Sequence, residues 1–301
     1  MPQQHPFSAV IKLPRDDQAG QVWEPTAHGA LHWAPHHDPG FSARMHTVAQ
    51  WVADAQPEAC VVDVSVEVAL FLRLLGIPTV VVALPGERTD APHVLVHRVA
   101  DHIIAAWPAK LNTPHWLQAH AHKTSYVGGI SRFEDRTPTV SAAESEAVQG
   151  LRVLVLGGAA DAFGEAERPD ALGDACTALG GASGQWAEDP WPHLCRADVV
   201  VSHAGQSSVA DIAAARRPAV IVPQHRPFNE QHATATMLHR QGLAVTTAQW
   251  PSSDDWPALL RRACASDPRH WRQWQVRGAA GRAAAAIEAT AVRCHKGRAR
   301  R

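Results

Sequence analysis

The sequence lacks the features that mark secreted, membrane-spanning and nucleic-acid-binding proteins. Its five cysteines are scattered, and neither a CxxC pair nor a secretory leader is visible, which is typical of reduced thiols in a cytoplasmic protein. No apolar run approaches the roughly 20 residues that a membrane-spanning helix needs. The formal net charge is -1 over 301 residues, so no overall positive field attracts nucleic acid. These absences predict a soluble cytoplasmic protein without a nucleic-acid partner.

Sequence patterns of common dinucleotide and metal sites are missing as well. The residues from Gly157 onward read GGAADAFG, which does not supply the GxGxxG of a dinucleotide-binding fold. Four histidines gather near the start of the chain: His28, His32, His36 and His37. Their spacing matches no zinc pattern, and no cysteine or acidic residue completes a set of ligands. We interpret them as loop histidines and predict neither a metal site nor a cofactor.

Short apolar runs alternate with helical patterns in both halves of the chain. In the first half, residues 60–64, 77–84 and 102–106 read as strands, with helices between them at 66–75 and 92–100. Such alternation is typical of parallel sheets with helices on their faces. Because a chain of this length suggests about two domains, we predict an α/β protein with two domains built on parallel sheets.

The predicted domain boundaries follow changes of composition. Residues 136–150 are rich in Ser, Ala, Glu and Thr without the apolar spacing of a helix or strand, and so read as a linker. The other predicted parts are an N-terminal domain at 1–135, a second domain at 151–268, a helix at 269–293 and a basic tail at 294–301. The tail lacks apolar spacing and allows at most a peripheral contact with an anionic membrane surface.

The most informative stretch of the sequence is residues 197–231. Residues 199–201 form an apolar run that predicts a buried strand, and apolar positions recur at helical spacing from Ser207. The turn between them carries His203, Gly205, Ser207 and Ser208. The first turn of a helix binds anions, because it offers unpaired backbone N–H groups and the positive end of the helix dipole. The turn therefore reads as a phosphate site, and the alternative is a helix cap at Ser207 and a polar loop residue at His203.

This stretch resembles the nucleotide-sugar-binding C-terminal domain of GT-B glycosyltransferases. It is similar to family 28, which includes the peptidoglycan N-acetylglucosaminyltransferase, and to the signature of UDP-glucosyltransferases. The resemblance places five residues around the diphosphate of a UDP-sugar: His203, Gly205, Gln206, Ser207 and Ser208. It also implies that Asp211 grips the ribose hydroxyls, and that Glu230 and Gln231 read the hydroxyls of the sugar. The expected architecture is the GT-B pair of Rossmann-like domains.

Four further positions are candidate donor-binding residues by the same resemblance. Gly158 belongs to a phosphate-facing loop, and Trp186 in the segment WAEDPW would cover the uracil ring. Arg132 and Arg226 would reach the diphosphate. Trp186 could instead be a core or surface residue in a chain with 11 tryptophans, and both arginines could be solvated loop residues.

Asp63 is the candidate catalytic residue of the first half. It lies at the end of a predicted strand, where the resemblance implies that an aspartate orients a histidine base and stabilises the imidazolium. The alternative is a turn acid or a helix cap. The base itself, expected in a Gly-rich turn after a first strand, is not visible. The N-terminal domain is therefore predicted to be incomplete, either because the true start lies upstream or because the catalytic element is lost.

Together these features predict an inverting glycosyltransferase that moves a hexosyl or N-acetylhexosaminyl group from a UDP-sugar to an acceptor hydroxyl. The sequence has no Asp-x-Asp element of the kind that holds Mn²⁺ or Mg²⁺ in metal-dependent transferases. The helix N-terminus, His203 and the serines would instead stabilise the leaving diphosphate. The acceptor is expected to be lipid-linked or a small molecule. An inactive nucleotide-sugar-binding protein and a UDP-sugar epimerase are the alternatives.

Overall fold

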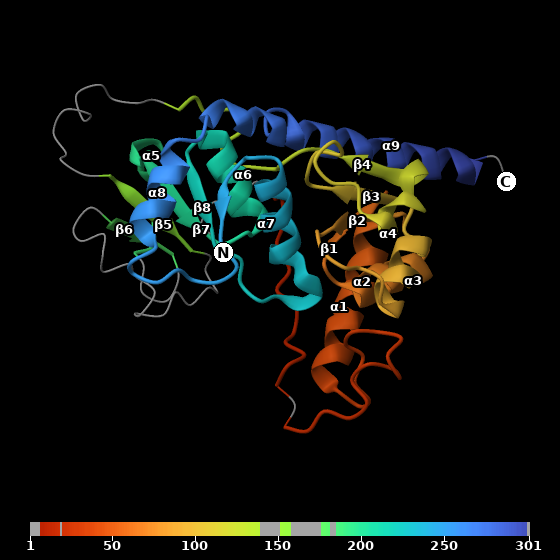
Figure 1. Cartoon of the computed structure of the whole chain (residues 1–301). Coiled ribbons are helices and arrows are strands. Elements are labelled where there is room, and N and C mark those ends of the chain that lie inside the picture. Colours follow the sequence, from red (N-terminus) through yellow and green to blue (C-terminus); the bar gives the residue numbers. More distant parts are fainter. Residues whose placement is uncertain (1–6, 19, 139–150, 158–175, 181–184, 300–301) are drawn as a thin grey trace. The chain divides into compact units, whose positions relative to one another are not determined.

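The computed structural model describes residues 7–18, 20–138, 151–157, 176–180 and 185–299 (Figure 1). The chain divides into two compact units. The first unit comprises residues 1–81, 89–102 and 289–301, and the second comprises residues 82–88 and 103–288. The predicted domain boundaries stay predictions, and only residues 136–138 of the predicted linker are among those described.

A four-stranded sheet in the N-terminal half has the strand order β1-β2-β3-β4, and β3 and β4 pair in parallel. The strands are β1 (Cys60–Asp63), β2 (Thr79–Ala83), β3 (His102–Ala105) and β4 (Thr124–Tyr126). The helices of this half are α1 (Pro39–Ala55), α2 (Val66–Leu74), α3 (Ala91–Val99) and α4 (His115–Gln118). The predicted alternation of strands and helices is confirmed here.

Local sequence signals explain where α1 and α2 begin and where α2 ends. Asp38 caps α1, because its Oδ1 accepts a hydrogen bond from the backbone N of Phe41 at 2.6 Å. Ser65 caps α2 in the same way, and its Oγ accepts from the backbone N of Val68 at 3.3 Å. Gly76 follows α2 with a φ of 79°, a left-handed conformation that glycine adopts without strain.

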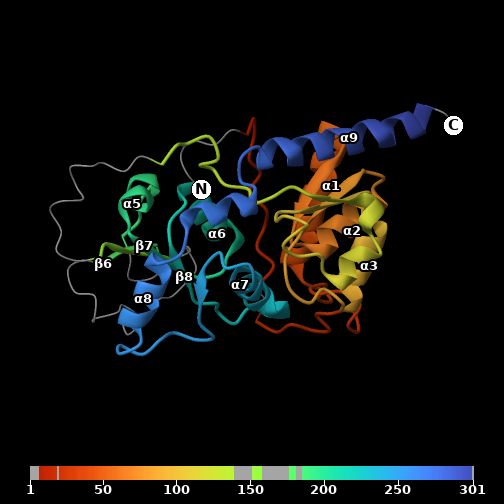
Figure 2. The ribbon, with the colours of Figure 1, turned by 45° about the horizontal axis from the view of Figure 1, so that its top comes forward.

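The second unit contains a five-stranded parallel sheet with the order β6-β5-β7-β8-β9. Its strands are β5 (Val153–Leu156), β6 (Cys176–Leu179), β7 (Val199–Ser202), β8 (Ala219–Ile221) and β9 (Val245–Thr246). Its helices include α5 (Trp191–Arg196), α6 (Gln206–Ala215), α7 (Glu230–Arg240) and α8 (Trp256–Cys264). Alternate residues of the central strands, such as Val153, Val201 and Val220, pack with Trp256 and Leu260 of α8 in one buried cluster. Figures 1 and 2 show α8 lying beside the strands of this sheet. Since the strands are parallel, their carboxyl ends meet at one edge of the sheet.

The C-terminal helix α9 runs over Ala279–Ala299, so the predicted start at residue 269 is wrong. Residues Pro268–Trp274 form a 3₁₀ helix, and the left-handed residues Gln275 (φ 54°) and Gly278 (φ 73°) follow it. A left-handed residue ends a right-handed helix, so α9 begins after this break. It then continues past residue 293 into the predicted basic tail.

Within the described part of the chain, none of the helices combines the length and the apolar character that crossing a bilayer requires.

Candidate functional site

The candidate site lies at the carboxyl edge of the five-stranded sheet. Leu156 of β5 pairs with Ser202 of β7, and Ser202 pairs with Ile221 of β8, so these three strands end at the same level. Ser202 Oγ donates a hydrogen bond to the carbonyl oxygen of Leu156 at 2.7 Å. Open α/β sheets bind ligands at this edge, which is where the predicted phosphate turn begins.

The N-terminus of α6 carries no side-chain cap. Its N-cap residue is Gly205, in an extended conformation (φ -67°, ψ 140°). Ser207 is exposed at the second helical position, so the alternative in which Ser207 caps the helix is wrong. A Cβ added at Gly205 would meet no atom within 4 Å. The start of this helix is therefore open to an anion, which the helix dipole and the free N–H groups favour.

His203 is buried directly before this turn. Its Nδ1 lies 2.8 Å from the carbonyl oxygen of Val222, and because a carbonyl only accepts, Nδ1 must carry the proton. The ring therefore links the end of β7 to the residue after β8 and is not a solvated loop side chain. To donate through Nε2 to an anion as well, the imidazole must be protonated on both nitrogens.

Gln206, the first residue of α6, holds a buried donor. Its Nε2 is buried and has no hydrogen-bond partner among the described residues. Buried polar groups are nearly always satisfied, so an unsatisfied amide at the start of a helix requires an explanation. A ligand bound at this position could explain the amide, because an oxygen of the ligand would accept its hydrogen bond.

A pocket of about 500 Å³ opens beside the first turn of α6, a size that suits a small-molecule ligand. Five predicted donor-binding residues line it: Arg132, Trp186, Ser207, Ser208 and, one turn further along α6, Asp211. Gly157, the neighbour of the predicted Gly158, also lines it, so the lining comes from four separate parts of the chain. Leu156, Leu179 and Gly180 form its wall at the strand ends. Gly158 itself lies outside the described residues.

Asp211 is buried in this wall. Its Oδ1 accepts a hydrogen bond from Ser131 Oγ at 2.6 Å, and Arg132 Nε lies 3.9 Å from its Oδ2. Burial raises the pKa of the Asp211 carboxyl, and the hydrogen bond from Ser131 and the charge of Arg132 offset this in part. A carboxylate held in this way offers acceptor oxygens for hydroxyl groups.

Ser131 was missed at the sequence level, although it follows the Gly128–Gly129 pair. Gly128 has a φ of 82°, and a side chain at Gly129 would collide with the indole of Trp274. Gly129 N also donates to the carbonyl oxygen of Trp274 at 3.0 Å. The two glycines therefore permit a close approach of two backbone segments, which brings Ser131 to Asp211.

Arg132 and Trp186 are exposed at the mouth of the pocket. The side chain of Arg132 is 57% exposed, and its guanidinium lies 4.8 Å from the ring centre of Phe133. Trp186 is 76% exposed. An aromatic ring at a pocket mouth with so little packing is available to stack on a planar ligand.

Glu230 and Gln231 open α7 and already have partners within the chain. Gln231 is buried, and its Oε1 accepts from the backbone N of Gln224 at 2.8 Å. Glu230 Oε2 accepts from Arg88 Nη2 at 3.2 Å. Arg226 Nη2 donates to Gln224 Oε1 at 3.2 Å. These three predicted donor-binding residues shape the loop between β8 and α7, and they are not among the described residues that line the 500 Å³ pocket.

Asp63 lies at the end of β1, as predicted, and its side chain is exposed. Its backbone oxygen accepts from Ser65 N at 3.0 Å across Val64, whose φ of 75° is unusual for a β-branched residue. Partial desolvation raises the pKa of its carboxyl. Among the described residues no imidazole contacts the carboxylate, so its catalytic role stays a prediction.

Comparison with known families finds a match within the second unit. Residues 192–253 match the model of the glycosyltransferase family 28 C-terminal domain. Over 61 residues the chain is 41% identical to the UDP-N-acetylglucosamine–N-acetylmuramyl-(pentapeptide) pyrophosphoryl-undecaprenol N-acetylglucosamine transferase of Rubrobacter xylanophilus. That match covers 20% of this chain and 18% of the relative, so it spans less than a fifth of the curated protein.

Solved structures resemble a much larger part of the chain. MurG of Acinetobacter baumannii superposes with a TM-score of 0.58 at 17% identity, over 81% of this chain and 77% of that protein. The calicheamicin glycosyltransferase CalG4 gives a TM-score of 0.53 at 16% identity, over 83% and 77%. At such identities the likeness shows the fold alone. The chain therefore has the α/β fold of the GT-B glycosyltransferases, and residues 192–253 of its second unit match the family 28 C-terminal domain.

Proposed function

We propose that this protein is an inverting glycosyltransferase that uses a UDP-sugar donor. It transfers a hexosyl or N-acetylhexosaminyl group to an acceptor hydroxyl, and its donor site needs no metal ion. The observation that carries this proposal is the pocket at the start of α6, where Ser207, Ser208 and Asp211 line one wall. These residue types are the ones that a diphosphate and a ribose require.

The proposed donor complex assigns one chemical task to each part of the pocket. The diphosphate lies at the N-terminus of α6, where backbone N–H groups and the hydroxyls of Ser207 and Ser208 donate hydrogen bonds. Asp211 accepts from the ribose hydroxyls, and Trp186 stacks on the uracil ring. Negative charge grows on the diphosphate as the glycosidic bond breaks, so the same donors act more strongly in the transition state.

The acceptor side requires a base that removes the hydroxyl proton. Asp63 would orient and stabilise an imidazole that performs this step. The acceptor oxygen then attacks the anomeric carbon from the face opposite the leaving UDP, which inverts the configuration. Protonated His203 would add a donor to the diphosphate through Nε2.

The name of the curated relative supports the proposed donor and acceptor classes. Its name describes transfer of N-acetylglucosamine to a pyrophosphoryl-undecaprenol acceptor. We therefore propose UDP-N-acetylglucosamine as the first donor to test, with a lipid-linked acceptor and small-molecule acceptors as the two acceptor classes. A cytoplasmic protein with a peripheral membrane contact fits a lipid-linked acceptor.

Isothermal titration calorimetry of the full chain with UDP, UMP and UDP-N-acetylglucosamine tests the donor site. We expect one binding site for UDP, weaker binding of UMP because it lacks one phosphate, and at least tenfold weaker UDP binding in S208A than in the wild type, the scale of one lost charge-assisted hydrogen bond. S266A is the matched control, because Ser266 Oγ donates only to the nearby carbonyl oxygen of Ala263. Equal affinities in both variants would contradict the proposed diphosphate position.

A transfer assay that measures UDP release tests the reaction class. Release should depend on an added hydroxyl acceptor, and the product should carry the inverted anomeric configuration by NMR. Conversion of the UDP-sugar without acceptor would identify an epimerase, and UDP binding without any turnover would identify a nucleotide-sugar-binding protein. Either result would overturn the proposed reaction.

A further inference from the structure

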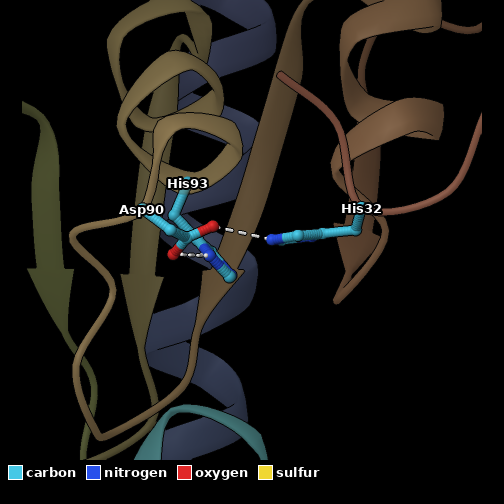
Figure 3. Close-up of side chains that lie close together, drawn as sticks. All are labelled: His32, Asp90 and His93. Carbon is cyan, nitrogen blue, oxygen red and sulfur yellow. Dashed lines mark hydrogen bonds and ion pairs between the residues drawn. The ribbon is translucent and has the colours of Figure 1, made fainter. Parts of the chain in front are cut away.

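Three side chains of the first unit converge around one carboxylate (Figure 3). Asp90 accepts from His93 Nδ1 through Oδ1 at 2.6 Å, and its Oδ2 lies 2.7 Å from His32 Nε2. The candidate ligand atoms of the three residues all lie within 4.8 Å of one another. Figure 3 shows His32 reaching the carboxylate from a separate segment, opposite the first turn of α3.

Asp90 does not act as an ordinary helix cap. It occupies the N-cap position of α3, but its side chain makes no capping hydrogen bond and instead faces the two imidazoles. A capping hydrogen bond at this position would stabilise the start of the helix. The carboxylate is therefore directed toward the histidines, and α3 lacks a capping hydrogen bond from it.

The loop that carries His32 is fixed from behind. The backbone N atoms of His32 and Trp33 both donate to Glu67 Oε1, at 2.8 and 3.1 Å. On the other side, His93 packs against the ring of His97 with centroids 5.9 Å apart. Both imidazoles are thus held in place by their surroundings, which is what a preorganised ligand set needs.

We propose that His32, Asp90 and His93 form a Zn²⁺ site. His32 would bind through Nε2, His93 through Nδ1 and Asp90 through a carboxylate oxygen, which leaves a fourth position for water. Two imidazoles and one carboxylate suit zinc, whereas Mg²⁺ and Ca²⁺ prefer oxygen ligands alone. At metal–ligand distances of about 2.0–2.2 Å the three ligand atoms lie about 3.4 Å apart, so small side-chain movements replace the present hydrogen bonds.

Zinc binding would displace the protons that now link the histidines to Asp90. Each neutral imidazole would keep its one proton on the nitrogen that faces away from the metal, and any further proton would pass to solvent. The ion would tie the segment around His32 to the first turn of α3. The other three histidines of the N-terminal group do not join them: His28 pairs with Glu24, and the His36 and His37 rings contact each other.

Zinc titration of the chelator-treated full chain tests this site. We expect the wild type to bind one more Zn²⁺ with high affinity than D90N, H32Q or H93Q, and each variant to lose at least about tenfold in zinc affinity. Substituted Co²⁺ should give the visible absorption of a tetrahedral site in the wild type alone. H28Q and the double variant H36Q/H37Q are the controls, since they remove histidines of the same segment that lie outside the cluster.

Two measurements separate loss of zinc from loss of structure. H32Q changes no residue of α3, so its circular dichroism should match that of the wild type while the Co²⁺ spectrum is lost. UDP titration reports on the second unit and should be unchanged in all three variants. If the wild type binds no more Zn²⁺ than D90N, the site does not exist. The same conclusion follows if H36Q/H37Q loses as much bound Zn²⁺ as H32Q does. A wild type that binds zinc but no UDP would overturn the proposed glycosyltransferase function and leave this site intact.

Discussion

The two units concentrate their polar side chains in different ways. In the second unit, His203, Ser207, Ser208 and Asp211 come from one turn and the helix that follows it. In the first unit, His32 meets Asp90 and His93 across a separation of 58 residues. The first arrangement leaves a signature in a short stretch of sequence, and the second leaves none.

This difference follows from how a ligand group is held. A diphosphate can be bound by consecutive backbone N–H groups at one helix start, so its site is local in sequence. The cluster around Asp90 takes His93 from the same helix turn, but it takes His32 from a segment 58 residues away. Local sites are therefore visible in a single sequence, whereas clusters assembled from distant segments become visible only in three dimensions.

The largest expected effect is that of a negative charge at the start of α6. Aspartate at position 205 is a good N-cap, so G205D should leave Tm unchanged or slightly raised. It should nevertheless weaken UDP binding by more than about 100-fold, because like charges in close contact cost several kcal/mol. Calorimetry and a thermal melt of the same sample measure both quantities. G205A adds an uncharged Cβ into open space and should reduce UDP affinity far less. Equal losses of UDP affinity in G205A and G205D would show that charge repulsion is not the cause.

A smaller effect is expected at Asp211, where binding and stability should change in opposite directions. Loss of a charged acceptor costs about 1.5–3 kcal/mol, so D211N should weaken UDP binding by about 10- to 100-fold. Burial raises the pKa of this carboxyl in the folded state. Its contribution to stability is therefore complete below the unfolded pKa and is lost as pH rises through the folded pKa.

At neutral pH the ionised Asp211 thus costs stability, and D211N should raise Tm by about 2–4 °C, or roughly 1 kcal/mol. This gain should shrink as the pH falls toward the unfolded pKa of the carboxyl. Thermal melts from acid to neutral pH measure it. D254N changes an exposed aspartate of the same unit and should alter neither quantity. A D211N variant that is less stable at neutral pH would contradict this account.

Trp186 provides a test with a matched partner in the other unit. Its ring is 76% exposed, and that of Trp23 in the first unit is 74% exposed. W186A should weaken UDP binding by about fivefold, the value of one aromatic stacking contact, with no change in Tm. W23A should change neither. Tryptophan fluorescence quenched by UDP in W23A but not in W186A would locate the uracil ring.

The smallest effect on binding is expected at the opposite edge of the same sheet. Asp198 precedes β7, and its carboxylate accepts from the backbone N of Arg152 at 2.8 Å and from its guanidinium at 3.0 Å. Burial alone would raise the pKa of Asp198, but the hydrogen bonds from Arg152 lower it. Its stabilising contribution is therefore present above the unfolded pKa and is lost as pH falls through the folded pKa.

D198N should lower Tm at neutral pH by about 2–4 °C, since a partly exposed pair contributes roughly 1 kcal/mol. The difference from the wild type should disappear in acid, and the UDP affinity should stay the same. A changed UDP affinity in D198N would show that the two edges of the sheet are coupled, which the local arrangement of the donor residues does not require.

Several features of the site were predictable because their signals are local. The apolar run of β7, the turn at Gly205 and the helical spacing after it identify a strand, a turn and a helix within a few residues of one another. The caps at Asp38 and Ser65 also act over only three residues. Ser131 was not predictable as a partner of Asp211, because no periodicity relates two residues that are 80 positions apart.

The break before α9 shows the opposite limit of local reasoning. The sequence predicts a helix from residue 269, although its alanine-rich part begins only at residue 279. Trp271 and Trp274 are buried, and the Trp271 indole donates to the carbonyl oxygen of Arg217. Burial of these two indoles holds the segment Pro268–Trp274 as a 3₁₀ helix. Packing overrides the intrinsic preference, and the α-helix starts only after Gly278.

The sequence by itself determined the α/β class, the alternation of strands and helices, and the strand, turn and helix around His203 to Ser208. These depend on hydrophobic period, capping and backbone N–H groups, all of which act over a few residues. Tertiary structure alone decided that Ser131 reaches Asp211, that Arg88 pairs with Glu230, and that His32 joins Asp90 and His93. Contacts of this kind depend on the directions in which packed segments approach one another, and a linear pattern carries no record of those directions.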